Sequence, residues 1–415
     1  MKKNRKRLLL TVAIVAAIVA AFFVADIVIF DTAKIPDFAY TERADTYVRR
    51  ETVERWNRGA LTDLPAVGKP GAETLGFDLR SYDISGFSLI DKQDELKKVS
   101  YDSFTRWSEE LPDGFDPEII MESGMNPGLG VRQLREQSIT GEGVSIAIID
   151  QPLNIDHVEY ADRIRSYEIL HSMEGSSMHG AAVTSIAVGR NCGVAPGADV
   201  YYISSAFIRL KPAGFVTDVS VLADGIDRVL EINRLLPDDK KIRVISVSMG
   251  YRKSLAGRRV ISAIERAKEE GVFVITTAPE YNYGFRYNGL GRDNNSDPDS
   301  FDSYMPGLFW EDSLYSGYHS DDPASTLLVP MDARTYASSS SSDGYEFCSQ
   351  GGLSWSAPWL SGLYALCVQV KPDITPEEFI ERAFETGVQK TIIHNGKGYT
   401  LGMIVDPVSL IESLK

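Results

Sequence analysis

The 415-residue sequence contains few cysteines, few histidines and a deficit of positive charge. Cys192, Cys348 and Cys367 form neither a CxxC pair nor a His/Cys spacing, so the sequence predicts no disulfide framework and no zinc site. The formal net charge of -15 argues against nucleic acid as a partner, because binding to phosphates requires a basic face. The chain has five histidines, so each candidate for proton-transfer chemistry can be weighed separately.

A long apolar run lies near the N-terminus, over residues 8–30. It is preceded by a cluster of cations: Lys2, Lys3, Arg5, Lys6 and Arg7. The run is long enough to cross a bilayer, and the cations predict a cytoplasmic N-terminus. A cleaved secretory signal is the alternative, but its apolar core is usually shorter and ends at a clear cleavage site. We therefore expect residues 1–7 to be cytoplasmic, residues 8–30 to be an uncleaved transmembrane anchor, and the remaining chain to lie outside the cytoplasmic membrane.

Residues 31–125 form a polar, charged extension with short turn-marked pieces and no motif that carries chemistry. A stalk, a packing layer and an inhibitory segment are all compatible with this composition. The extension is therefore expected to be extracytoplasmic, with its role open.

From residue 126 to residue 415 the pattern changes to strands that alternate with helices. Continuous β-branched runs are typical of strands buried in a parallel sheet. They cover residues 144–150, 200–204, 243–250 and 272–278, with helical patterns over 219–236 and 258–271. The alternation predicts an α/β domain with a doubly wound, mostly parallel sheet flanked by helices. In such folds function gathers at the carboxyl ends of the strands, where Asp150 lies.

Three residues have the types and contexts that acyl transfer requires. Ser354 lies between a small-residue turn and an apolar run with Pro358 near its start, which predicts that Ser354 opens a buried helix. Backbone N–H groups and the helix dipole favour an anion there, although a serine that merely caps the helix is the alternative. His179 precedes a helix of small residues. A nucleophile, a base and a carboxylate to orient that base make up an acyl-transfer site, so Asp150, His179 and Ser354 are the candidates.

The segments around these residues resemble the subtilisin-like serine peptidases over residues 126–415. The similar blocks, in family order, are VSIAIID, HGAAV, GVAPGA, SVSMG and GLSWSAP. The resemblance implies a triad of Asp150, His179 and Ser354 that hydrolyses peptide bonds through an acyl-enzyme, without a cofactor. It also implies that Ser248, Met249 and Gly250 bind the substrate backbone.

Two segments depart from the family pattern. Pro152 follows Asp150-Gln151 where the family has glycine, so the turn after Asp150 must differ. The run that ends at residue 278 continues with Pro279 and Glu280, where the family has Gly-Asn and the asparagine amide donates to the oxyanion. An ionised glutamate only accepts hydrogen bonds. We expect Asn282 to supply the amide through a shifted loop, with the backbone N–H of Ser354 as the alternative donor.

The remaining candidates are expected to carry no chemistry. His157, His171 and His319 lack a glycine-helix context and are expected at the surface. The acidic loop over residues 292–302 has oxygen ligands at alternate positions, but Pro298 stands where a helix-loop-helix calcium loop needs glycine. The loop is therefore interpreted as a solvated insertion, and no metal is expected.

The sequence thus predicts a membrane-anchored serine endopeptidase that acts on peptide or protein substrates outside the cytoplasmic membrane. The alternative is a catalytically weak or inactive homologue that binds a peptide or protein partner in the same groove. The altered oxyanion segment motivates this alternative.

Overall fold

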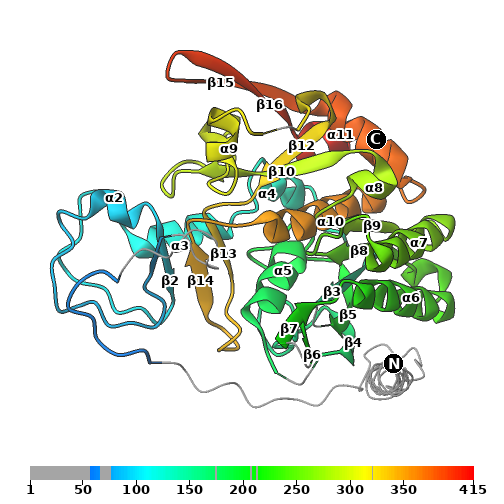
Figure 1. Ribbon diagram of the computed structural model, residues 1–415, viewed down its shortest axis with the longest axis horizontal. Coiled ribbons are helices and arrows are strands. Elements are labelled where there is room, and N and C mark those ends of the chain that lie inside the picture. The colour runs from blue at the N-terminus through cyan, green and yellow to red at the C-terminus, as the bar shows by residue number, and fades with distance from the viewer. Residues whose placement is uncertain (1–56, 66–75, 173–174, 206–207, 212–213, 320) are drawn as a thin grey trace, which may run out of the picture. The chain divides into compact units, whose positions relative to one another are not determined.

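The computed structural model describes residues 57–415, except 66–75, 173–174, 206–207, 212–213 and 320 (Figure 1). The expected cytoplasmic segment and the expected anchor over residues 8–30 lie outside the described residues. Within the described part of the chain, no helix is long and apolar enough to span a bilayer.

A parallel sheet of five strands, in the order β4-β5-β3-β8-β9, forms the centre of the region after residue 126 (Figure 1). The strands are β3 (Ser145–Asp150), β4 (Ile164–His171), β5 (Asp199–Ser205), β8 (Ile242–Val247) and β9 (Phe273–Thr276). The four β-branched runs of the sequence form β3, β5, β8 and β9. The patterns did not indicate the edge strand β4.

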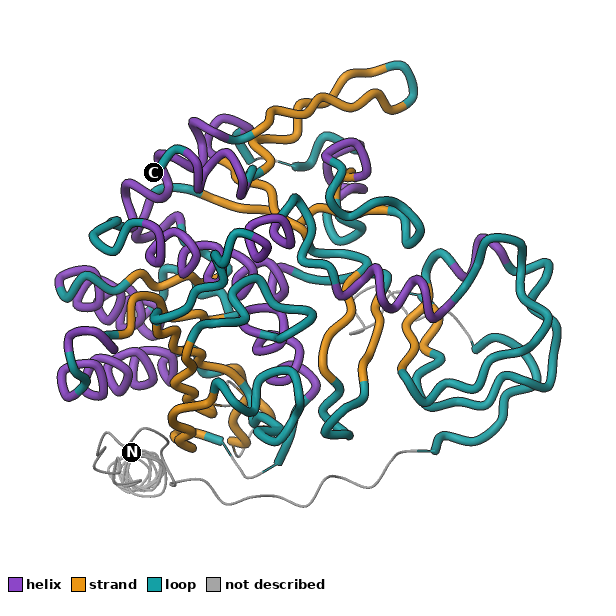
Figure 2. The backbone as a smooth tube through the Cα atoms, turned by 180° about the vertical axis from the view of Figure 1, so that it is seen from behind, coloured by secondary structure: helices purple, strands orange, loops and turns teal. Residues whose placement is uncertain are grey.

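Helices cover both faces of this sheet (Figure 2). They are α5 (Met178–Val188) and α10 (Leu353–Val370) on one face, and α6 (Ser220–Leu235) and α7 (Leu255–Glu269) on the other. Successive residues of β3 show the alternation, since Ile146 and Ile148 belong to the core formed with α5 and α10. Ile149 instead faces α6, where a Cβ added to Gly225 would lie 3.0 Å from its side chain. The prediction of a parallel sheet flanked by helices is confirmed.

A second, mixed sheet lies beyond α10, in the order β11-β10-β12-β16-β15. Its strands are β10 (Arg286–Arg292), β11 (Tyr304–Pro306), β12 (Thr326–Pro330), β15 (Val388–His394) and β16 (Lys397–Ile404). β10, β12 and β16 are parallel, whereas β11 and β15 are antiparallel to their neighbours. Because α10 contacts β8 and β9 as well as β10 and β12, it lies between the two sheets and is buried along most of its length.

The described part of the extension forms a stack of parallel turns. β1 (Phe77–Asp78) pairs with β2 (Val99–Asp102), and Ala60, Asp83 and Arg106 form successive parallel bridges. The paired positions recur about every 22 residues, as in a short solenoid. The β2 strand also pairs antiparallel with β14 (Tyr345–Cys348), which pairs with β13 (Arg334–Ala337). The extension therefore contributes strands to a sheet that it shares with the region after residue 126.

A separate hydrophobic core holds this shared sheet together. Leu79 and Tyr101 from the extension pack in one buried cluster with Ala333 and Phe347. A partly buried ion pair, Arg80 Nη1 to Glu346 Oε2 at 3.0 Å, joins the same two parts. The described part of the extension therefore packs against the region after residue 126 through one sheet and one core.

Short elements connect these layers. They are α2 (Gln93–Leu96), α3 (Pro117–Met125), α4 (Val131–Glu136), β6 (Ile208–Lys211), β7 (Gly214–Thr217), α8 (Glu280–Tyr283), α9 (Glu311–Tyr315), α11 (Pro376–Thr386), α12 (Pro407–Glu412), and 3₁₀ turns at Asp238–Lys240, Phe301–Ser303 and Pro323–Ser325.

One of the histidines expected at the surface is not there. His157 is fully buried, and its Nε2 donates to the carbonyl of Gly344 at 2.8 Å while its Nδ1 accepts from the N–H of Glu159 at 3.2 Å. The surface prediction is therefore wrong for His157, because backbone groups compensate for the lost water. His319 is partly exposed and packs on Trp310, with ring centroids 4.8 Å apart.

The acidic loop over residues 292–302 is organised around its own cation. The buried Arg292 guanidinium donates to the carbonyls of Asp293, Asn294 and Ser296 at 3.2, 3.4 and 3.0 Å. These carbonyls are thus already engaged by a positive group. Among the described residues, no cluster of three or more His, Cys, Asp or Glu side chains has the arrangement of a metal site.

Candidate active site

Asp150 and His179 form a hydrogen-bonded pair at the carboxyl end of the central sheet. Asp150 ends β3 and is fully buried, and its Oδ1 accepts from His179 Nδ1 at 2.6 Å. Because a carboxylate only accepts, Nδ1 carries the proton, and Nε2 is the basic nitrogen of the neutral ring. This tautomer is the one a general base requires.

The second oxygen of Asp150 is unusual. Oδ1 also accepts from the N–H of Gln151 at 2.8 Å, but the buried Oδ2 has no hydrogen-bond partner among the described residues. Pro152 explains part of this, since proline has no N–H to donate back to the aspartate two residues earlier. The expected difference in this turn therefore leaves a carboxylate oxygen without a donor.

The start of α5 is fixed against the same turn. Ser177 caps the helix, accepting from the N–H of His179 at 3.2 Å, and donates to Gln151 Oε1 at 2.6 Å. A Cβ added to Gly180 would lie 2.6 Å from the carbonyl oxygen of Gln151 and 2.8 Å from the hydroxyl of Tyr202. Burial raises the pKa of Tyr202 well above its usual value, so its hydroxyl stays protonated and donates to the Gln151 carbonyl. Only glycine after His179 allows this close approach.

Ser354 is the second residue of α10, where the backbone N–H groups have no intrahelical acceptor. The sequence predicted Pro358 in the first turn of the helix. The helix begins at Leu353, so Pro358 lies in the second turn. Pro358 has no N–H to donate to the carbonyl of Ser354, four residues earlier. Ser248 supplies the missing donor, because its Oγ lies 2.7 Å from the Ser354 carbonyl oxygen.

His179 contacts Trp355, the residue that follows Ser354. The rings of His179 and Trp355 meet edge to face, with centroids 5.7 Å apart, and Trp355 meets Tyr336 in the same way at 5.6 Å. The start of α10 therefore lies against the base. The Ser354 hydroxyl itself points to the carbonyl oxygen of Ser248, at 3.3 Å.

Ser248, Met249 and Gly250 directly follow β8, beside the end of β9. The carbonyl of Met249 accepts from the N–H of Thr277 at 3.2 Å, and a Cβ added to Gly250 would lie 2.8 Å from Thr277 Oγ1. The segment expected to bind the substrate backbone is thus packed directly against the segment expected to hold the oxyanion donor.

Asn282 does not have the surroundings of an oxyanion donor. It lies in α8, and its Nδ2 donates to the carbonyl of Ile261 at 3.2 Å and to Glu265 Oε1 at 2.6 Å, both on α7. Its Oδ1 accepts from the hydroxyl of Tyr251 at 2.6 Å. Both amide hydrogens are therefore engaged on α7, which does not fit the expected role. The sequence could not show this, because the short helix after Pro279 turns the side chain toward α7.

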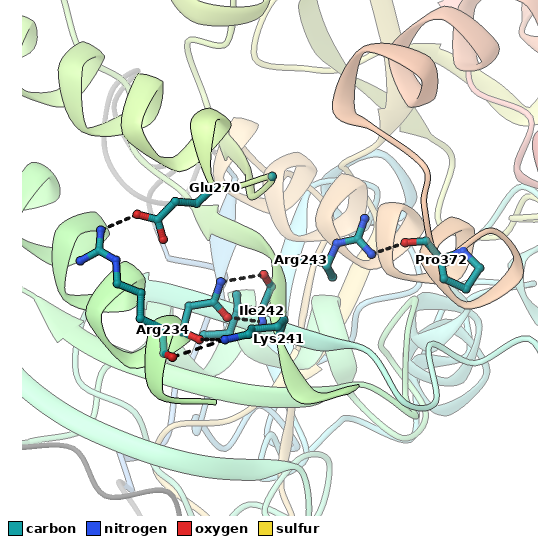
Figure 3. Close-up of a pocket in the computed structure, with 8 residues that line it drawn as sticks. Arg234, Lys241, Ile242, Arg243, Glu270 and Pro372 are labelled. Atoms are coloured by element: carbon teal, nitrogen blue, oxygen red, sulfur yellow. Dashed lines mark hydrogen bonds and ion pairs between the residues drawn. The ribbon is translucent and has the colours of Figure 1, made fainter. Parts of the chain in front are cut away.

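A separate hollow of about 490 Å³ lies at the amino end of β8 (Figure 3). Asp150 ends the neighbouring parallel strand β3 and therefore lies at the opposite end of the sheet. Three cations line it, but they are already engaged. Lys241 donates to the carbonyls of Asn233 and Arg234 at the end of α6, Arg243 donates to those of Pro372 and Ile374, and Arg234 pairs with Glu270. The charged groups of this hollow therefore bind other parts of the chain, and no serine, threonine or cysteine lines it.

A family model described as the subtilase family matches residues 141–403, more than half of the chain, and this range includes Asp150, His179 and Ser354. The chain belongs to the subtilase family. This subtilase is similar to the serine protease AprX of Bacillus subtilis (strain 168), with 23% identity over 287 residues. That match spans 61% of this chain and 63% of AprX, so the chain covers less than two thirds of its relative.

The chain is also similar to solved structures at low identity. Fervidolysin from Fervidobacterium pennivorans, a keratinolytic enzyme related to subtilisin, has a TM-score of 0.50 and 17% identity, covering 70% of this chain and 45% of that one. The PatG macrocyclase in complex with peptide has a TM-score of 0.47 and 14% identity, covering 69% of this chain and 95% of that one.

Proposed function

We propose that this subtilase is a serine endopeptidase in which Ser354 is the nucleophile, His179 the general base and Asp150 the group that orients the base. The observation that carries the proposal is the hydrogen bond from His179 Nδ1 to buried Asp150, next to the start of α10. A peptide or protein is the substrate, and no cofactor takes part.

The reaction follows from these positions. The Ser354 hydroxyl turns from the Ser248 carbonyl to Nε2 of His179, gives its proton to this nitrogen and attacks the peptide carbonyl. The resulting imidazolium is stabilised by Asp150. It then returns the proton to the leaving amine, and an acyl-enzyme forms. A water molecule, deprotonated by His179, hydrolyses the ester and restores Ser354.

The oxyanion is held with fewer donors than the resemblance implies. The backbone N–H of Ser354, in the first turn of α10, is the donor that remains, because Glu280 stands in the place of the family's asparagine and Asn282 is engaged on α7. A single oxyanion donor typically contributes about 10²- to 10³-fold in kcat. We therefore propose a slow peptidase.

This weakness also supports the alternative of an inactive homologue that binds a peptide or protein partner. Ser248, Met249 and Gly250 bind the substrate backbone in both cases. The two functions differ only in whether Ser354 reacts.

The proposed setting is outside the cytoplasmic membrane, with residues 8–30 as a single-pass anchor and residues 1–7 in the cytoplasm. Five cations before an apolar run support this topology. Protease added to intact cells should remove the domain and leave a short membrane-bound stub. A full-length protein that stays protected until lysis would reverse the topology.

A fluorophosphonate probe tests the catalytic proposal on the full-length protein. Wild type should be labelled, Ser354→Ala should not be labelled, and labelling of His179→Ala should fall sharply. Ser356→Ala is the matched control, because Ser356 lies in the same helix and its buried hydroxyl has no partner among the described residues. It should be labelled like wild type.

Labelling that persists in Ser354→Ala would contradict the assignment of the nucleophile. An unlabelled wild type that still binds unfolded polypeptide would favour the binding protein. Cleavage of an unfolded protein at internal bonds, mapped by mass spectrometry, distinguishes an endopeptidase from an esterase.

A further inference from the structure

Four glycines enclose the turn at Met331 and Asp332, which directly follows β12. A Cβ added to Gly289, Gly307 or Gly351 would lie 2.1, 2.4 or 2.4 Å from an atom of Met331, and one added to Gly291 would lie 2.8 Å from Asp332 Oδ2. None of these positions has room for a side chain. The turn is thus held in close contact with β10, with the loop before α9 and with the segment that leads to Ser354.

The backbone of this turn is strained and tightly bonded. Ala333 has a φ of 53°, in the left-handed region that residues with a Cβ rarely adopt. The N–H groups of Met331 and Asp332 both donate to the carbonyl of Leu290 at 3.0 Å, and the N–H of Ala333 donates to that of Ser349 at 3.0 Å. Such strain persists only where the surrounding structure imposes it, and it is common at functional sites.

Asp332 joins two distant backbone segments within this turn. Its carboxylate is 2% exposed, Oδ1 accepts from the N–H of Gly351 at 2.7 Å, and Oδ2 accepts from the N–H of Leu308 at 2.9 Å. No ion pair to Asp332 occurs among the residues that the structure describes. Burying a carboxylate without a cation lowers the stability of the fold, so we infer that Asp332 has a function that offsets this cost.

We propose that Asp332 is a positioning residue for the nucleophile. Its carboxylate ties the Gly351 N–H, three residues before Ser354, to the Leu308 N–H on the opposite side of the turn. Gly351 and Gly352 would otherwise leave the chain before α10 free to move, and with it the Ser354 hydroxyl. This inference rests on the proposed function of Ser354.

The charge state of Asp332 bears on this role. Burial raises the pKa of Asp332 to about 7, and the nearby Glu311 adds to the effect. When one carboxylate oxygen of Asp332 is protonated, that oxygen becomes a donor. The N–H of Gly351 or of Leu308, whichever it bonded, then loses its acceptor. The other charged groups around the turn are Arg292, which donates to the carbonyl of Ala333, and Arg334 on β13.

Asp332→Asn tests the proposal, because an amide can accept only one of the two bonds. The matched control is Glu159→Gln. Glu159 is 1% exposed, and its Oε2 likewise accepts two backbone N–H groups, those of Asn191 and Cys192, beyond the far end of α5 from His179. Two readouts are measured on the full-length proteins: hydrogen exchange of the peptide covering residues 349–354, and the rate of fluorophosphonate labelling.

In Asp332→Asn we expect faster exchange over residues 349–354 and labelling that is about 10- to 100-fold slower, as for a small misplacement of a reacting group. The KM for a peptide substrate should change little. In Glu159→Gln, exchange should change near residues 189–193 and near Tyr345, whose hydroxyl donates to Glu159 Oε1 at 2.7 Å, but not over residues 349–354, and labelling should match wild type.

Wild-type exchange and labelling in Asp332→Asn would overturn the proposal. If wild type itself is not labelled, the proposed function fails, and exchange alone still decides the role of Asp332. If Asp332→Asn does not fold, hydrogen exchange of wild type over residues 349–354 decides, compared at pH 6 and pH 8 after correction for the intrinsic exchange rate. Protonation of Asp332 removes one acceptor and should lower the protection at pH 6, and equal protection at the two pH values would contradict the proposal.

Discussion

The hydrogen bond from Ser248 to Ser354 leads to a quantitative prediction about the stability of α10. Because Pro358 has no N–H, the hydroxyl of Ser248 takes the place of the helical donor to the Ser354 carbonyl, at 2.7 Å. Ser248 is only 5% exposed, so water does not readily replace it. We expect Ser248→Ala to lower the free energy of unfolding by about 1–3 kcal/mol, the usual cost of a buried polar group left without a partner.

Pro358→Ala provides the second half of a double-mutant cycle. Alanine restores an N–H at position 358, and the Ser354 carbonyl then regains a donor from within the helix. In that background Ser248→Ala should cost less than about 0.5 kcal/mol, so the coupling energy between the two sites should be at least about 0.5 kcal/mol. The assay is urea unfolding of the full-length protein followed by far-UV circular dichroism, with Ser354→Ala in every variant to prevent self-cleavage.

Ser361→Ala is the control within the same helix. The Ser361 hydroxyl also donates to a helix carbonyl, that of Ala357 at 2.9 Å, but this carbonyl keeps the backbone donor of residue 361. Its cost should be small and independent of Pro358→Ala. If Ser248→Ala costs the same with and without Pro358, the hydroxyl does not replace the missing helical bond, and the reasoning is refuted.

Three further outcomes are expected. Asn282→Ala should keep kcat within about twofold of wild type while lowering the free energy of unfolding by about 1 kcal/mol, since it loses bonds to α7; a hundredfold drop in kcat would instead restore its oxyanion role. Burial raises the pKa of Asp332 to about 7, so the carboxyl stabilises the fold least when ionised. Unfolding free energy of wild type, relative to Asp332→Asn, should therefore fall as the pH rises from 4 to 7, by up to about 4 kcal/mol in urea titrations. Residues 126–415 expressed alone should be insoluble, because β14 loses its partner strand β2 and Phe347 loses the apolar residues that bury it. Co-expression of residues 57–125 should restore solubility. A soluble fragment 126–415 that the probe labels would contradict this.

Much of the central architecture is predictable because local pattern and tertiary environment agree there. Strands such as β3 are buried on both faces and therefore carry continuous β-branched runs, and their ends fix where Asp150 lies. His179 and Ser354 are each found at the start of a helix, as expected from the small residues that follow His179 and precede Ser354. For these three positions the local sequence determines the local structure.

Other features depend on distant partners and leave no local signal. His157 is polar in the sequence but buried, because the Gly344 carbonyl, far along the chain, accepts from its ring. The orientation of Asn282 depends on Glu265 of α7. The turns of the extension resemble polar loops, since each contributes at most four paired residues to its sheet, the four of β2 being the most.

The extension and Ser354, the proposed nucleophile, are connected by a short stretch of chain. β2 pairs with β14 as far as Cys348, and the N–H of the next residue, Ser349, donates to the carbonyl of Val99 at 3.2 Å. Ser354 follows five residues later, and Asp332 holds Gly351 between them. The family model begins at residue 141, yet the strand that leads into the nucleophile is paired with a segment before it. If Ser354 is the nucleophile, as proposed, changes in the packing of the extension should reach it through β14 and the five residues that follow Ser349.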